Sequence, residues 1–117
     1  MDIKRWEIWL ANLDPNFGTE AGKIRPVLVI QSDLLTVVHF STAVLPITSK
    51  VVSGVHILRF NLHAIQAETG LSQNSDVLLD QIRTIDNKRF VRKMGSIGDQ
   101  TSRLKIEEKL KVVLLLG

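Results

Sequence analysis

The chain contains no cysteine. This absence excludes disulfide bonds, thiolate zinc sites and a cysteine nucleophile, and it fits a reducing compartment. The longest apolar run, VVLLL at 112–116, is far shorter than the roughly 20 residues that span a bilayer. The first residues, MDIKRWEIWL, lack the apolar segment and small-residue cleavage site of a secretory signal. We therefore expect a cytoplasmic protein without a membrane segment.

The motifs of several catalytic classes are also missing. There is no P-loop, no GxGxxG and no GxSxG elbow, although composition alone leaves a Ser/His/Asp triad open. His39, His56 and His63 show neither an i, i+4 pair nor an HExxH pattern, so we interpret them as surface or packing residues. We expect neither a metal nor a cofactor.

The 117 residues, 44% of them hydrophobic and 23% charged, suit one globular domain over residues 1–117. The formal net charge of +3 weakly favours anionic partners, because basic surfaces attract phosphates.

Short apolar runs separated by turn residues predict a mainly β domain. A loop is expected at 14–23, where Pro, Asn and two Gly gather, and the run 26–30 suits a strand buried on both faces. Strands are expected at 7–13, 26–30, 41–47, 56–62, 76–82 and 89–97. Several of these strands are apolar on both faces, which favours a surface for a second subunit.

The C-terminal segment has a different periodicity. Ile106, Leu110, Val113 and Leu114 fall at i, i+4, i+7 and i+8, which predicts an amphipathic helix capped by Asp99 or Thr101. Strands followed by one helix predict the α+β class: a small curved sheet or barrel with the helix packed on it.

Arg25 stands between a glycine-bearing loop and an apolar run, in TEAGKIRPVL. Its guanidinium is always charged and matches phosphate geometry, so an anion clamp is one interpretation. An ion pair with Glu20 or Asp33 is the other. Thr48, in PITSK, is similarly open between a phosphate donor and a turn-forming hydroxyl. Glu20 is open between a general base and a solvated loop carboxylate.

Two polar blocks follow. LDQIRTID, 79–86, predicts either a ligand-binding corner or mutual pairing of its Asp and Arg side chains. The run KRFVRK, 88–93, predicts either a track for a phosphate backbone or a solvated face.

The motifs WEIWLANLDP, GTEAGKIRPVLVIQSD, LPITS, ETGL and LLDQIRTID, in this order between Arg5 and Asp86, resemble the MazF/PemK family of toxin endoribonucleases. The resemblance implies an SH3-like antiparallel barrel with a C-terminal helix that works as a homodimer. It implies metal-independent, sequence-specific cleavage of single-stranded RNA, leaving a 2′,3′-cyclic phosphate and a 5′-hydroxyl. It also implies inhibition by a cognate antitoxin, which we expect to bind through an acidic, partly disordered segment.

The resemblance assigns catalytic roles to Arg25, Thr48 and, less uniformly across the family, Glu20. We expect the flanking polar residues to contact RNA. They are Asn16, Thr19, Lys23, Ser49, Lys50, Asp80, Gln81 and Arg83.

Two departures from the family pattern qualify the resemblance. Lys23 stands where a second glycine often precedes Ile-Arg-Pro, and Leu78 stands where the Kid-like branch has an arginine, although Asp80 is retained. Leu78 favours the Arg25 and Thr48 set over the Kid-type set. The alternative is a CcdB-like gyrase poison, which shares the barrel but relies on a tryptophan near its C-terminus. Here both tryptophans are N-terminal, Trp6 and Trp9, and the chain ends in VVLLLG.

Overall fold

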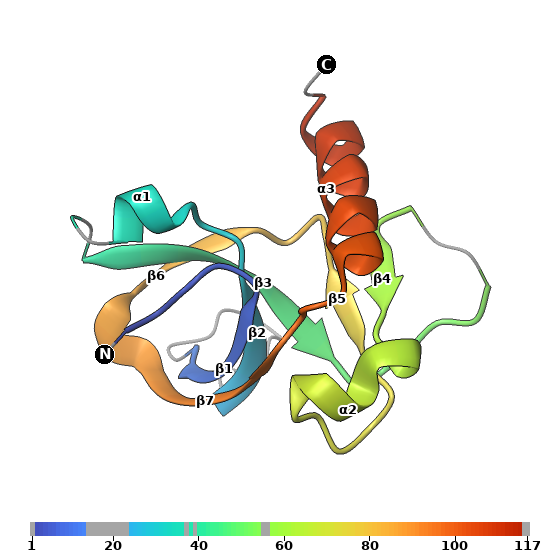
Figure 1. Ribbon diagram of the computed structural model, residues 1–117, viewed down its shortest axis with the longest axis horizontal. Helices are drawn as coiled ribbons and strands as arrows, with labels where there is room; N and C mark the ends of the chain where they lie inside the picture. Colours follow the sequence, from blue (N-terminus) through green and yellow to red (C-terminus); the bar gives the residue numbers. More distant parts are fainter. Residues whose placement is uncertain (1, 14–23, 37, 39, 55–56, 116–117) are drawn as a thin grey trace.

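The computed structural model describes residues 2–13, 24–36, 38, 40–54 and 57–115 of the chain. The described strands form one seven-stranded sheet, with short helical turns between them and one long helix at the end (Figure 1). The strands are β1 (Glu7–Asn12), β2 (Ile24–Val29), β3 (Ser41–Thr48), β4 (Arg59–Asn61), β5 (Asp76–Leu78), β6 (Arg83–Asp86) and β7 (Phe90–Ser96). The helical segments are α1 (Asp33–Thr36), η1 (His63–Ile65), α2 (Gln66–Thr69), η2 (Asn87–Arg89) and α3 (Gln100–Leu114).

All strand pairs are antiparallel, in the order β4-β5-β3-β2-β1-β7. Strand β3 pairs with three other strands. One edge of β3 pairs with β2, and the other edge pairs with β6 along 41–44 and with β5 along 47–48. No pairing among the described strands joins β4 to β7, so the curved sheet does not close. The α+β class and the C-terminal helix are confirmed; the closed barrel is not.

The central strands are buried on both faces, as the apolar run at 26–30 predicted. Successive side chains of a strand point to opposite faces. Ile8 and Leu28 therefore belong to the core that includes Ile106 of α3, while Trp9 and Val27 belong to a second core inside the curved sheet. Each apolar face of these strands thus packs against other residues of the same chain. This packing accounts for the strands that are apolar on both faces.

Helix α3 begins at the predicted cap. The Asp99 carboxylate accepts hydrogen bonds from the Ser102 amide (3.2 Å) and hydroxyl (2.6 Å), so Asp99 rather than Thr101 takes this role. These contacts satisfy groups that the first turn of a helix leaves unpaired.

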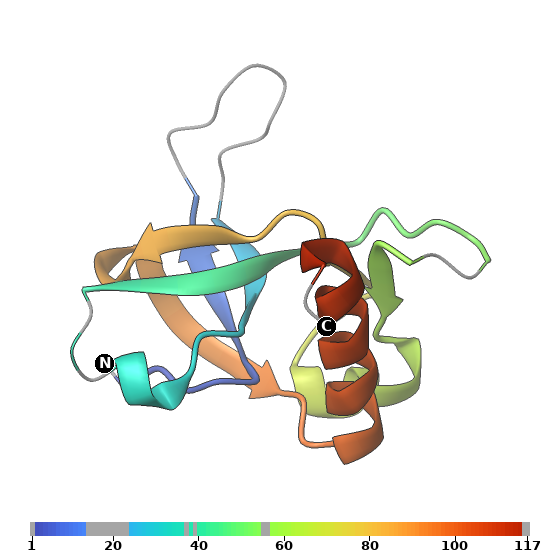
Figure 2. The same cartoon turned by 90° about the horizontal axis from the view of Figure 1, so that it is seen from above.

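The predicted apolar face of α3 is mostly correct. Ile106 and Leu110 are buried, and Val113 packs against the same core. Figure 2 shows α3 along one end of the sheet. Leu114 is 48% exposed, so its assignment to this face was wrong. Among the described residues, no helix has both the length and the apolarity to cross a membrane.

The predicted strand 76–82 is too long, because only its first three residues, 76–78, form a strand. Strand β5 ends at Leu78, the chain turns at 79–80, and β6 begins at Arg83. Leu79 is nevertheless fully buried, and its amide donates to the Leu58 carbonyl (2.9 Å). A continuous apolar run gives no signal for such a turn, because the turn residue itself stays in the core.

Two other boundaries moved. The predicted strand 56–62 is limited to β4, with His56 outside the described residues. The predicted strand 26–30 begins two residues earlier, at Ile24, so that Arg25 lies within β2 rather than before it.

Candidate active site

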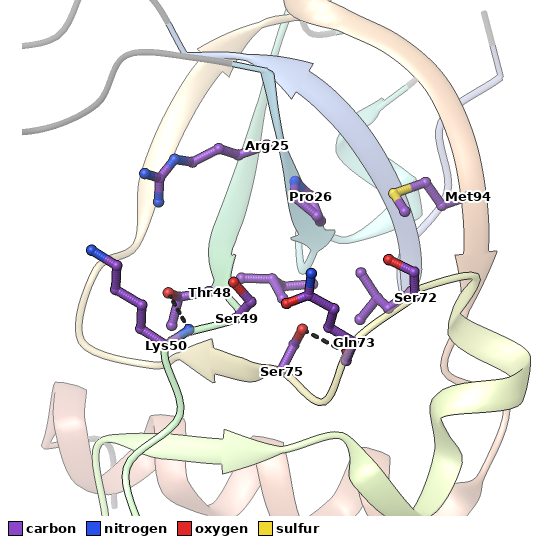
Figure 3. Close-up of a pocket in the computed structure, with 11 residues that line it drawn as sticks. Arg25, Pro26, Thr48, Ser49, Lys50, Ser72, Gln73, Ser75 and Met94 are labelled. Atoms are coloured by element: carbon purple, nitrogen blue, oxygen red, sulfur yellow. Dashed lines mark hydrogen bonds between the residues drawn. The ribbon is translucent and has the colours of Figure 1, made fainter.

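A pocket of about 260 Å³ opens where β2, the end of β3, β7 and the segment after α2 meet (Figure 3). Its described lining carries two cationic side chains and several hydroxyls but no Asp or Glu. The lining residues are Arg25, Pro26, Ile47, Thr48, Ser49, Lys50, Leu71, Ser72, Gln73, Ser75 and Met94. Two cationic side chains beside hydroxyl donors, with no carboxylate in the described lining, favour an anionic ligand.

Arg25 is placed rigidly on β2. It lies opposite Ala11 of β1, and Pro26 fixes its own φ and restricts the backbone of Arg25. The side chain is partly buried and forms no ion pair with another described residue. Asp33 instead accepts a hydrogen bond from the Arg5 amide (2.8 Å). The proposed Arg25–Asp33 pair is therefore wrong, and Glu20 lies outside the described residues.

Thr48 is the last residue of β3, at the point where the chain leaves the sheet. Its Oγ1 accepts a hydrogen bond from the Lys50 amide (3.1 Å), so the hydroxyl does form a turn. A hydroxyl has one proton to donate besides its lone pairs. The turn therefore leaves that proton available to an acceptor in the pocket, and the two interpretations of Thr48 are compatible.

One end of the pocket is charged and the other end is not. The charged groups of Arg25 and Lys50 lie at one end, with Thr48 and Ser49 beside them, and Met94 lies at the other (Figure 3). Such a division suits a ligand with a phosphate at one end and an uncharged part at the other.

The wall formed by 71–75 depends on two close backbone approaches. Gly70 has φ +74°, and a Cβ there would collide with the backbone of Met94. A Cβ on Gly95 would collide with the backbone of Glu68 and Thr69. Both glycines let α2 lie directly on β7, which sets the following residues against the pocket. Sequence reasoning missed this wall; its one signal was the glycine of ETGL.

Residues 4–114 match the model of a protein family. The family is described as "PemK-like, MazF-like toxin of type II toxin-antitoxin system". The chain belongs to this family. The resemblance seen in the motifs between Arg5 and Asp86 is thus confirmed.

Two curated relatives of this MazF-like chain are named as endoribonucleases. Endoribonuclease EndoA of Bacillus subtilis is 34% identical over 116 residues, covering 99% of this chain and 97% of that one. Endoribonuclease MazF of Staphylococcus epidermidis is 31% identical over 117 residues, covering 98% and 93%.

Solved structures show the same fold. The toxin MazF-mt6 of Mycobacterium tuberculosis superposes with a TM-score of 0.76 at 25% identity, covering 95% of this chain and 98% of that one. An endoribonuclease in complex with its cognate antitoxin, from a mycobacterial species, superposes with a TM-score of 0.75 at 14% identity, covering 99% and 96%.

The other predicted site residues of the MazF-like chain lie elsewhere. Asp80 and Gln81 are exposed in the turn after β5, and Arg83 lies on β6 opposite Val44; none of the three lines the pocket. The remaining predicted contacts lie outside the described residues: Asn16, Thr19, Glu20 and Lys23. Within 79–86 no Asp–Arg ion pair joins described residues, so the mutual pairing offered as one of two alternatives is absent there.

The basic run 88–93 has structural contacts of its own. The Arg89 guanidinium donates to the Asn12 carbonyl (3.1 Å), and the Lys93 ammonium lies 2.9 Å from Glu7. Burial raises the pKa of Glu7, but hydrogen bonds from Lys93, Trp9 and a backbone amide outweigh it and hold that pKa below its ordinary value. Two cations of the run are thus engaged within the fold.

The part of the chain that the structure describes contains no cluster of side chains that could bind a metal ion. No group of three or more His, Asp or Glu residues gathers there, and His63 lies exposed in η1. His39 and His56 lie outside the described residues. The cationic charge of the pocket comes from Arg25 and Lys50 instead.

Proposed function

We propose that this chain is a toxin endoribonuclease that cleaves single-stranded RNA in the pocket around Arg25. The observation that carries the proposal is the grouping of Arg25, Thr48 and Lys50 without a described carboxylate beside them. An anionic phosphodiester fits this charge, and both curated relatives are named as endoribonucleases.

The reaction begins when a ribose 2′-hydroxyl attacks the adjacent phosphorus. The 2′-oxygen forms a bond to phosphorus, the bond to the 5′-oxygen breaks, and the products are a 2′,3′-cyclic phosphate and a 5′-hydroxyl. A base takes the 2′ proton, and the leaving 5′-oxygen takes a proton from a solvent water molecule. We assign the base to Glu20. DNA lacks the attacking group, which explains a preference for RNA.

Arg25 and Thr48 stabilise the charge that builds on the phosphoryl oxygens. The guanidinium supplies paired donors of fixed geometry, and the Thr48 hydroxyl supplies one more. Lys50 adds a point charge at the same end of the pocket. Because these groups carry the positive charge, the reaction needs no metal ion.

RNA on either side of the cut contacts the rest of the predicted set. Asn16, Thr19 and Lys23 act from the residues that precede β2 in the sequence, and Ser49 acts from the pocket. Asp80, Gln81 and Arg83, which lie outside the pocket, contact nucleotides further along the strand.

The biological unit in this proposal is a cytoplasmic homodimer of single-domain subunits that a cognate antitoxin inhibits. A structural neighbour is an endoribonuclease in complex with its cognate antitoxin. The excess of positive charge suits an acidic, partly disordered antitoxin segment. Leu34 within α1 and Phe40 after it, 84% and 89% exposed, supply apolar surface for a protein contact.

The test compares the wild type with Arg25→Ala on single-stranded RNA in EDTA. We expect the wild type to leave 2′,3′-cyclic phosphate and 5′-hydroxyl ends, and the variant to lose about 10²–10³ in kcat. Arg92→Ala, a matched charge removal at an exposed position of β7, should retain activity. Intact RNA with the wild type, or equal cutting by Arg25→Ala, refutes the proposal.

Two further outcomes have defined meanings. Loss of activity in Arg92→Ala alone would move RNA binding from the pocket to the basic run 88–93. Trapping of gyrase–DNA complexes by the protein would support the CcdB-like alternative instead.

A further inference from the structure

A buried carboxylate lies directly behind the charged end of the pocket. Asp76 opens β5, is 2% exposed, and is the cross-strand partner of Thr48 on β3 and of Asn61 on β4. It does not line the pocket itself. Burial of a carboxylate costs free energy of folding unless hydrogen bonds compensate for the lost water. The hydrogen-bond partners of Asp76 therefore indicate which parts of the chain it fixes.

Both oxygens of Asp76 are engaged. Oδ1 accepts from the Asn61 amide group (2.9 Å), while Oδ2 accepts from the Arg59 guanidinium (3.2 Å) and from the Val52 backbone amide (3.3 Å). The same Arg59 nitrogen, Nη1, also donates to the Lys50 carbonyl (2.8 Å). Asp76 thus reaches the segment after β3 twice, directly at Val52 and through Arg59 at Lys50.

That segment carries the proposed phosphate-binding groups. Thr48 and Lys50 line the pocket, and the Lys50 amide donates to the Thr48 hydroxyl. Among the described strands, the pairs that hold Ile47 and Thr48 in the sheet are those with β5, and the strand pairing ends at Thr48. The residues after Thr48 would otherwise be free to shift. The carboxylate and guanidinium therefore fix the backbone on which the pocket's hydroxyl and ammonium sit.

We propose that Asp76 and Arg59 are positioning residues for RNA cleavage: together they hold the segment 48–52 so that Thr48 and Lys50 face the same phosphate as Arg25. This inference rests on the proposed function. It also explains why β4 and β5 carry the ion pair of Arg59 and Asp76 at this position. A buried ion pair is weak support for stability compared with well-packed apolar residues, whereas only hydrogen-bonding groups can grip a backbone amide and carbonyl. Misplacement of a reacting group by about 1 Å costs on the order of 10²-fold in rate.

The first variants are Asp76→Asn and Arg59→Gln, assayed on single-stranded RNA well below their melting temperatures. Asp76→Asn keeps the shape of the side chain but leaves it only one acceptor oxygen; Arg59→Gln removes the bridge to Lys50. We expect kcat to fall by about 10–100-fold in each, with KM changed less than threefold. The double variant should be no worse than the poorer single variant, since the two residues act as a unit.

Glu7→Gln is the matched control. Glu7 is also a buried carboxylate paired with a cation, but its partner Lys93 joins β1 to β7 outside the pocket lining. Its substitution should lower the melting temperature while kcat stays within twofold. If Asp76→Asn does not fold, Arg59→Gln decides, because the Arg59 side chain is 25% exposed and its loss is tolerable.

Amide hydrogen exchange gives a readout independent of cleavage. Exchange at Val52 should accelerate at least tenfold in Asp76→Asn and remain unchanged in Glu7→Gln. Cleavage by the wild type, its loss in Arg25→Ala, and full kcat in both Asp76→Asn and Arg59→Gln would overturn the positioning role while leaving the function intact. A wild type without ribonuclease activity would instead overturn the function, and with it this inference.

Discussion

Thr48→Val isolates the contribution of a single hydroxyl in the pocket. Valine keeps the branched shape at the end of β3 and replaces only the hydroxyl with a methyl group. The folded chain loses one hydrogen bond, from the Lys50 amide at 3.1 Å. Because Lys50 is exposed, water replaces that contact, and stability should fall by less than about 1 kcal/mol.

The kinetic loss should be much larger than the loss of stability. The hydroxyl proton has no acceptor among the described residues, so it is available to a phosphoryl oxygen. Removal of one preorganised donor to a developing negative charge lowers kcat by about 10²–10³, equivalent to about 2.7–4 kcal/mol. Thr48→Ser keeps the hydroxyl and the turn, so we expect it to stay within tenfold of the wild type.

The assay is single-turnover cleavage of a short RNA, with thermal unfolding measured on the same preparations. A Thr48→Val protein that cuts within threefold of the wild type would refute the donor role. Equal loss in Thr48→Ser and Thr48→Val would also count against the donor role, because serine keeps the hydroxyl and should then retain most of the activity.

Three further predictions concern stability. The fold lowers the pKa of Glu7 from 4.5, so its ionised carboxylate contributes to the free energy of unfolding above pH 4.5. This contribution is lost as the pH falls through the lower pKa of the folded state. Glu7→Gln should therefore reduce the loss of stability at acid pH, measured by urea titrations at several pH values. Gly70→Ala should destabilise by about 1–3 kcal/mol, because its φ is positive and a Cβ meets the Met94 backbone; an unchanged urea midpoint would contradict this. Ile106→Ala should cost about 2–5 kcal/mol by leaving a cavity under α3, measured as a lower denaturant midpoint with an unchanged m-value.

Elements with a long, regular pattern could be predicted from the sequence. The period of α3 and its cap at Asp99 were readable because both depend on residues a few positions apart. Arg59 and Asn61, two positions apart on β4, share a face for the same local reason, and both donate to one carboxylate, that of Asp76. Local spacing carries this information by itself.

The remaining features depend on contacts between distant parts of the chain. The single turns α1 and α2 are too short to show a period, and the break after β5 lies within a buried run. Asp76 meets Arg59 and Val52 only because β3, β4 and β5 pair, so no local pattern could single it out. Of the predicted site, Arg25, Thr48, Ser49 and Lys50 meet in one pocket, whereas Asp80, Gln81 and Arg83 do not.

The described pocket gathers side chains from β2, the end of β3, the segment 71–75 and β7, and these segments are spread over most of the chain. No fragment that lacks one of them carries the complete lining. A growing chain on the ribosome therefore has no finished pocket until Met94 has been added and β7 has paired with β1. A protein whose activity threatens the cell that makes it would thus become active only as a nearly full-length, folded chain, which leaves the time of its own synthesis for a partner to be ready.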